Sequence, residues 1–127
     1  EPLDQKVLAD PKAHYVDSGG TVLFAKVNGR VMGTCALRNM GRGVFELCKM
    51  AVTASAQGHG LGEKLGRAII ARATRLGGKT LVLESHHSLE RAVRLYERLG
   101  FIHKPPAHRT FKRTDVYMEL PLKRRGK

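Results

Sequence analysis

Apolar and polar residues alternate in two short runs near the start of the chain, and this period of two predicts two β-strands. The runs cover residues 21–27 and 30–37, and only Asn28-Gly29 separates them. Asn-Gly between alternating runs is a strong hairpin signal, because both residues tolerate the positive φ of a tight turn. We therefore expect an antiparallel hairpin, followed after another tight turn by a strand over residues 44–52.

Two later segments change to the period of an α-helix. Their apolar positions are Leu61, Leu65, Ala68, Ile69 and Leu76 in the first, and Leu89, Ala92, Val93, Tyr96 and Leu99 in the second. We expect Gly77-Gly78 and Gly100 to end these helices and Ser88 to cap the second. A short buried strand is predicted at 80–84 between the helices. Two closing strands are predicted, one from Phe101 and one over 116–122.

The order of these elements predicts a mixed α/β sheet with helices on its faces. Strand, helix, strand, helix, strand requires parallel pairing through right-handed crossovers, and here it follows an antiparallel meander. A chain of 127 residues is expected to form one domain, residues 1–127. Within it we expect a loop-rich lead-in at 1–20 and a basic tail at 123–127.

Composition narrows the class of protein. Hydrophobic residues make up 42% of the chain, and no apolar run approaches the length of a membrane span. Residues 1–4 do not resemble a signal peptide, so we expect a soluble, cytoplasmic protein. Cys35 and Cys48 lie in apolar runs without a Cys-x-x-Cys motif, and we expect them to be reduced thiols.

The chain is strongly basic. Lys and Arg number 23 against 11 Asp and Glu, a net charge of +12, which favours acidic partners. Much of the excess lies at Arg91, Arg94, Arg98, Lys104, Arg109, Lys112, Arg113 and the tail 123–127. A solvated helix face with a cationic tail explains these charges better than a nucleic-acid surface, because no helix-turn-helix, zinc finger or aromatic platform accompanies them.

A glycine-rich loop, Gln57-Gly58-His59-Gly60-Leu61-Gly62, lies directly before the first helical segment. Its glycines leave backbone amides uncovered, so the amides can point together at an anion, and the helix N-terminus adds its own free N–H groups. The dinucleotide pattern Gly-x-Gly-x-x-Gly fails at Glu63, and the Gly-Lys-Ser/Thr of a phosphate loop is absent. The loop therefore predicts a phosphorylated cofactor of another class.

Three segments in order resemble the GNAT superfamily of N-acetyltransferases. The loop fits Gln-x-x-Gly-x-Gly; Glu46–Val52 resembles the family's central strand, and Leu83-Glu84-Ser85 with residues 92–101 resembles its second cofactor motif. The resemblance covers about residues 21–120. It implies the GNAT acyl-CoA N-acyltransferase fold and direct transfer of an acetyl group from acetyl-CoA to a primary amine of a small molecule or peptide, without a metal.

The resemblance also implies which residues contact the cofactor. They are Met50, Ala51, Val52, Gln57, Gly58, His59, Gly60, Leu61, Gly62, Ser85 and Tyr96. The pantetheine arm of coenzyme A is expected to pair, like a strand, with the backbone of Met50 to Val52.

Two residues are candidates for the chemistry. An alkyl amine has a pKa near 10.4, so a base must remove its proton, and Glu46 stands where histone-type members carry a glutamate base. The alternative is a solvated Glu46, or one paired with Lys49 or Arg42. By resemblance, Tyr96 lies near the thioester sulfur and donates a proton to the departing thiolate, although its spacing also suits a core aromatic residue.

Further expectations concern the class of protein, its assembly, a metal site and the N-terminal elements. A non-catalytic acyl-CoA-binding or sensor module remains an alternative to an enzyme, and a homodimer remains open. His86-His87 lacks a third ligand at helical spacing, so we predict no metal site. Family members open with a strand and two helices before the hairpin, whereas about twenty residues precede Thr21 here, so those helices are expected to be missing and the chain to be part of a longer protein.

Overall fold

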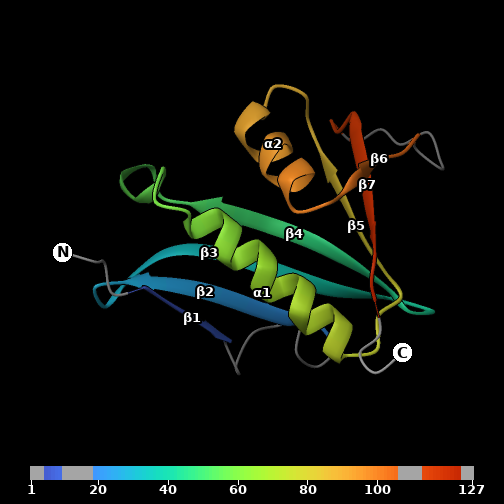
Figure 1. Ribbon diagram of the computed structural model, residues 1–127, viewed down its shortest axis with the longest axis horizontal. Helices are drawn as coiled ribbons and strands as arrows, with labels where there is room; N and C mark the ends of the chain where they lie inside the picture. Colours follow the sequence, from blue (N-terminus) through green and yellow to red (C-terminus); the bar gives the residue numbers. More distant parts are fainter. Residues whose placement is uncertain (1–4, 10–18, 106–112, 124–127) are drawn as a thin grey trace.

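One mixed seven-stranded sheet forms the body of the protein (Figure 1). The computed structural model describes residues 5–9, 19–105 and 113–123. Its strands are β1 (Gln5–Ala9), β2 (Thr21–Val27), β3 (Arg30–Gly41), β4 (Val44–Val52), β5 (Thr80–Ser85), β6 (Ile102–His103) and β7 (Val116–Pro121), in the spatial order β1-β2-β3-β4-β5-β7-β6. The helices are α1 (Leu61–Arg75) and α2 (Glu90–Arg98), with a short 3-10 turn at Ala54–Ala56. The predicted mixed sheet is confirmed.

The predicted hairpin is present between β2 and β3. Asn28 and Gly29 have φ values of 51° and 82°, the left-handed conformation that a two-residue hairpin turn requires. β2 and β3 pair in antiparallel fashion from Thr21↔Leu37 to Val27↔Arg30. β3 continues to Gly41, four residues beyond the predicted end, because its last residues pair with β4.

Two parts of the predicted topology are wrong. The segment expected to be a loop-rich lead-in contains β1, which pairs with β2 along the sheet edge and turns the half-buried Val7 toward the core. β6 does not pair with β5 as the crossover argument requires, because β7 lies between them. The reason is burial: β7 places Val116 and Met118 in the core, whereas both residues of β6 are exposed.

Both helices cover the same face of the sheet. A Cβ added at Gly66 of α1 would lie 2.5 Å from Leu99 Cδ1, which follows α2, so the helices touch. α1 ends before Gly77, whose φ of 86° suits a helix C-terminus, as predicted. Ser88 does not cap α2, which makes no side-chain cap hydrogen bond; its hydroxyl is bonded to His86 Nδ1 instead.

The helical face encloses one hydrophobic core. Its fully buried members include Cys35, Leu37, Leu65, Ile69 and Leu81. No described helix covers the opposite face of the sheet, and none is long and apolar enough to cross a membrane. Three predicted features lie outside the described residues. They are the basic tail beyond Lys123, the basic residues Arg109 and Lys112, and most of the lead-in, namely residues 1–4 and 10–18.

Candidate active site

β4 and β5 begin side by side and then separate. In the described strands their parallel pairing covers only Val44–Glu46 with Thr80–Val82. Figure 1 shows the two arrows diverging, with α2 over the opening between them. The backbone of β4 from Leu47 onward is therefore not paired with β5, which leaves a strand edge available to a ligand.

A β-bulge lies in the same part of β4. Thr34 pairs with Ala51 and Ala36 with Cys48, so one residue of β3, Cys35, stands opposite two of β4, Lys49 and Met50. Lys49 takes up the extra length with a φ of 53°, which is unusual for a residue other than glycine. Bulges rotate the following residues relative to the strand, and here they present Met50, Ala51 and Val52 to a cleft.

The glycine loop opens into this cleft, which has a volume of about 770 Å³. Gly60 is the N-cap of α1 with a φ of 76°, and no side chain caps the first turn of the helix. A Cβ added at Gly58 or Gly60 would meet nothing within 4 Å, so the space beside the loop backbone is open. Uncapped amides and the positive helix end suit a pyrophosphate group.

Gln57 ties the loop to both sides of the cleft. Its Nε2 donates to the carbonyl oxygen of Val52 at 3.1 Å, and its Oε1 accepts from Arg91 Nη1 at 2.6 Å. These two bonds join the end of β4 to the start of α2. The glutamine of the predicted motif is thus a bridge that holds the loop in place.

Three arginines of α2, Arg91, Arg94 and Arg98, line the cleft. Their spacing of three and four residues places them on one side of the helix. Two acidic residues, Glu63 and Glu90, also line the cleft, and Glu63 lies 3.0 Å from Arg67 and 3.8 Å from Arg98. The sequence alone predicts a solvated helix face for these arginines. Their helical spacing, combined with the glycine loop, is the signal that points to their position at the cleft.

Glu46 lies on the sheet face opposite the helices, since both of its chain neighbours are buried in the core. Its Oε1 accepts a hydrogen bond from Arg38 Nη2 at 2.7 Å, across the β3–β4 ladder. The Glu46 side chain is only 12% exposed and that of Arg38 44%. Glu46 is therefore paired with Arg38, a residue that the alternative interpretation, a pair with Lys49 or Arg42, did not name.

Glu84 is a second carboxylate on this sheet face. In the sequence it stands out only as part of the Leu83-Glu84-Ser85 segment. Glu46 stands opposite Val82, so Glu84 lies two residues closer to the end of β5. Thr114 Oγ1 donates to Glu84 Oε1 at 2.8 Å. The signal for Glu84 was the alternation of β5, whose residues 81, 83 and 85 are buried while Glu84 is half-buried.

Of the predicted contacts, Met50 to Val52, Gln57, Gly58 and Gly60 to Gly62 line the cleft, whereas His59, Ser85 and Tyr96 are not among its lining residues. Tyr96 is 6% exposed and packs edge-on against Phe101, so its surroundings are those of a core aromatic residue. Burial raises the pKa of Tyr96 to about 12, because a phenolate loses hydration there. The phenol is therefore protonated at neutral pH and able to donate.

Both cysteines are free thiols, as predicted. Burial raises the pKa of Cys35 to about 12 and raises that of Cys48 above its usual value, with Glu46 adding to the second shift. Thiolate is the nucleophilic form of cysteine, and neither residue favours it at neutral pH. Neither cysteine is among the residues that line the cleft.

Comparison with known proteins identifies the family. The sequence model of the Acetyltransferase (GNAT) family matches residues 2–101. The chain belongs to this family. Membership of this family supports an acyltransferase enzyme, in agreement with the fold and with the glycine loop.

Individual GNAT relatives agree with this assignment. An uncharacterised N-acetyltransferase of Schizosaccharomyces pombe is 32% identical over 91% of this chain and 72% of its own length. A putative acyl-CoA N-acyltransferase from Klebsiella pneumoniae superposes with a TM-score of 0.82, covering 94% of this chain and 99% of that one at 22% identity. A putative acetyltransferase from Salmonella typhimurium, solved with its cofactor acetyl-CoA, has a TM-score of 0.72 and 28% identity over 88% of this chain and 70% of its own.

Proposed function

We propose that this GNAT protein transfers the acetyl group of acetyl-CoA directly to a primary amine. The observation that carries the proposal is the cleft into which the uncapped start of α1 and the unpaired part of β4 both open. The end of the cleft at the start of α1 suits the phosphates of coenzyme A, and the end at β4 suits its amide-containing pantetheine arm. The Salmonella typhimurium relative with acetyl-CoA supports this choice of cosubstrate.

The residues of the cleft fit coenzyme A in the following way. The amides of the glycine loop and of the first turn of α1 hold the pyrophosphate, with Arg91, Arg94 and Arg98 adding positive charge. The edge of β4 at Met50–Val52 accepts the pantetheine arm as an added strand. His59 and Ser85 stay predictions, since neither lines the cleft.

Bound acetyl-CoA supplies the thioester whose carbonyl carbon is attacked by the amine nitrogen, with the sulfur as leaving group. Glu46, after release from Arg38, would accept the proton that the amine loses. Tyr96, protonated at neutral pH, would donate the proton that the leaving sulfur gains. Orientation of the two reactants by the cleft supplies the larger share of the rate, because fixed geometry is worth about 7–11 kcal/mol.

The test is an acetyl-CoA turnover assay over a panel of amines. Free thiol release is followed with a peptide N-terminus, lysine, a polyamine, an aminoglycoside and a small alkyl amine as acceptors. We expect at least one amine to accelerate thiol release well above the rate in buffer. Tight acetyl-CoA binding without acceleration by any amine would instead identify the acyl-CoA-binding or sensor module.

Replacing Arg94 by Ala is expected to weaken coenzyme A binding at least about tenfold, because one charge-assisted hydrogen bond to phosphate is worth about 1.5–3 kcal/mol. Isothermal titration calorimetry with coenzyme A measures the Kd. Arg75→Ala is the matched control, since it removes an equal charge from an exposed position of α1 outside the cleft. Equal losses in both variants would show a general charge effect and contradict a phosphate contact at Arg94.

Replacing Tyr96 by Phe is expected to lower kcat with little effect on folding, because the ring still packs against Phe101. The measurement is a series of acyl donors whose leaving thiols differ in acidity. A proton donor matters least for the most acidic thiol, so the loss in kcat should shrink toward that end of the series. A constant loss across the series would assign Tyr96 to packing alone.

A further inference from the structure

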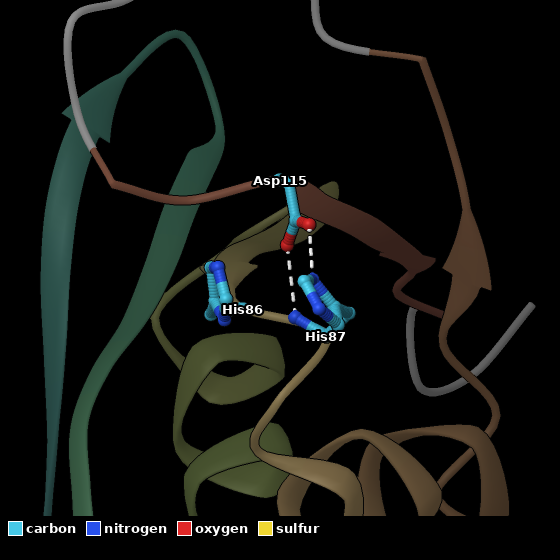
Figure 2. Close-up of side chains that lie close together, drawn as sticks. All are labelled: His86, His87 and Asp115. Carbon is cyan, nitrogen blue, oxygen red and sulfur yellow. Dashed lines mark hydrogen bonds and ion pairs between the residues drawn. The ribbon is translucent and has the colours of Figure 1, made fainter.

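His86, His87 and Asp115 form a side-chain cluster where β5 ends and β7 begins, and none of them lines the cleft (Figure 2). One possible ligand atom from each residue lies within 4.8 Å of the others. Asp115 is 28 residues from His87 along the chain, so the sequence around the two histidines shows no third ligand. The antiparallel pairing of Ser85 with Val116 brings it there.

Backbone contacts hold the carboxylate of Asp115 in position. The Asp115 amide donates to the carbonyl oxygen of Ser85 at 3.0 Å, and the His87 amide donates to Asp115 Oδ1 at 2.8 Å. Oδ2 then faces His87 Nδ1 at 2.5 Å, as the two dashed lines of Figure 2 show. One carboxylate oxygen is thus used to fix the group, and the other is presented to an imidazole.

The second imidazole is oriented as well. His86 Nδ1 is hydrogen-bonded to Ser88 Oγ at 2.7 Å, and the two histidine rings stack with centroids 4.3 Å apart. Among the described residues, Nε2 of His86 has no partner and is left for a ligand. A hydrogen bond on the other ring nitrogen is typical of metal-binding histidines, because it fixes the ring orientation.

We propose that His86, His87 and Asp115 bind a divalent transition-metal ion of the Zn²⁺ type. Two imidazoles and one carboxylate are ligands that such ions prefer over the all-oxygen sets of Mg²⁺ and Ca²⁺. With bonds of about 2.0–2.2 Å, the ligand atoms of a tetrahedral ion lie roughly 3.3–3.6 Å apart. The separations in the cluster, from 2.5 Å to within 4.8 Å, bracket that range.

Small side-chain rotations complete the site. The His87 and Asp115 side chains are 72% and 48% exposed, so they can adjust while the strands stay in place. The ion enters between His87 Nδ1 and Asp115 Oδ2, where a proton lies in its absence, and His86 supplies the third ligand atom. Water fills the remaining positions, since the cluster faces solvent.

The site adjoins the cleft through the chain itself. Ser88 and Leu89 follow the two histidines and line the cleft. An ion bound to His86 and His87 holds the start of the segment that connects β5 to α2, and so reduces the motion of the cleft wall at Ser88 and Leu89. Metal binding itself requires no acyl transfer, so its test is independent of the proposed function.

The test is calorimetric titration of the untagged protein with zinc chloride, with magnesium chloride in parallel. We expect one Zn²⁺ per chain and a rise in melting temperature with Zn²⁺ concentration, and no response to Mg²⁺. Asp115→Asn and His86→Ala should each weaken Zn²⁺ binding at least about tenfold. Both replace exposed or half-exposed side chains, and an unchanged metal-free melting temperature shows that each variant is folded.

Two controls address other zinc ligands. His103 pairs with Glu97 at 2.8 Å and so matches the His87–Asp115 pair without a second histidine. His103→Ala and Cys48→Ser should both retain the parent affinity for Zn²⁺. The proposal is overturned by an absence of Zn²⁺ binding at millimolar concentration, by unchanged affinity in Asp115→Asn or His86→Ala, or by an equal loss in His103→Ala.

Discussion

Acetyl-CoA is expected to raise the melting temperature of the protein with the logarithm of its concentration, and Gly60→Val is expected to abolish that rise. At 100 times Kd, binding stabilises the folded state by about 2.7 kcal/mol, or roughly 10 °C for a domain of this size. Gly60 has a φ of 76° and an open space in front of its backbone. A valine there strains the loop and fills the space proposed for the phosphates.

Gly29→Val is the matched control for backbone strain. Gly29 has a φ of 82°, a Cβ there would also meet nothing within 4 Å, and the residue lies in the β2–β3 turn outside the cleft. Both variants should lose about 1–2 kcal/mol of stability without ligand. Only Gly60→Val should lose the response to acetyl-CoA. A parent protein whose melting temperature does not change with saturating acetyl-CoA would refute the proposed cofactor site.

Glu46→Gln is expected to lower kcat/KM for the amine by about 10²–10⁴, the usual contribution of a positioned base. The amide keeps the shape of the side chain and removes its ability to accept a proton. Acetyl-CoA affinity should be nearly unchanged, because Glu46 does not line the cleft. The acidic limb of the plot of kcat/KM against pH should also disappear in the variant.

The ion pair with Arg38 makes a second variant necessary. If Glu46 serves only to pair with Arg38, then Arg38→Gln breaks the same contact and should give the same modest change as Glu46→Gln. If Glu46 is the base, Arg38→Gln leaves the carboxylate in place and retains most of the activity. A Glu46→Gln enzyme with the parent pH profile would turn attention to Glu84, the other carboxylate beside the β4–β5 opening.

The paired state of Glu46 has a consequence for the proposed reaction. Arg38 occupies one oxygen of the Glu46 carboxylate, so in the proposed reaction the approaching amine must displace Arg38 or share the carboxylate with it. The Arg38 side chain is 44% exposed and can move away without disturbing the core. In the proposed reaction, movement of the Arg38 side chain gives the acceptor amine access to Glu46.

Local sequence determined most of the elements of this protein. Several turns and boundaries occur where the sequence predicts them. They are the Asn28-Gly29 turn, the ends of β2 and β4, and the start of α1 and its end before Gly77. Each depends on residues within a few positions of one another: a positive φ, an alternating run, or an apolar stripe. The glycine loop belongs to the same class, because its chemistry comes from consecutive backbone amides.

Tertiary structure alone decided which distant residues meet. The β3–β4 register selected Arg38 as the partner of Glu46, and β7 entered between β5 and β6, which carried Asp115 to His87. These pairings depend on the burial of whole strands and on strand register, and a one-residue shift would move every side chain to the other face. Local patterns contain no information about register between distant strands, so the Arg38–Glu46 pair and the His86–His87–Asp115 cluster became visible only in the folded chain.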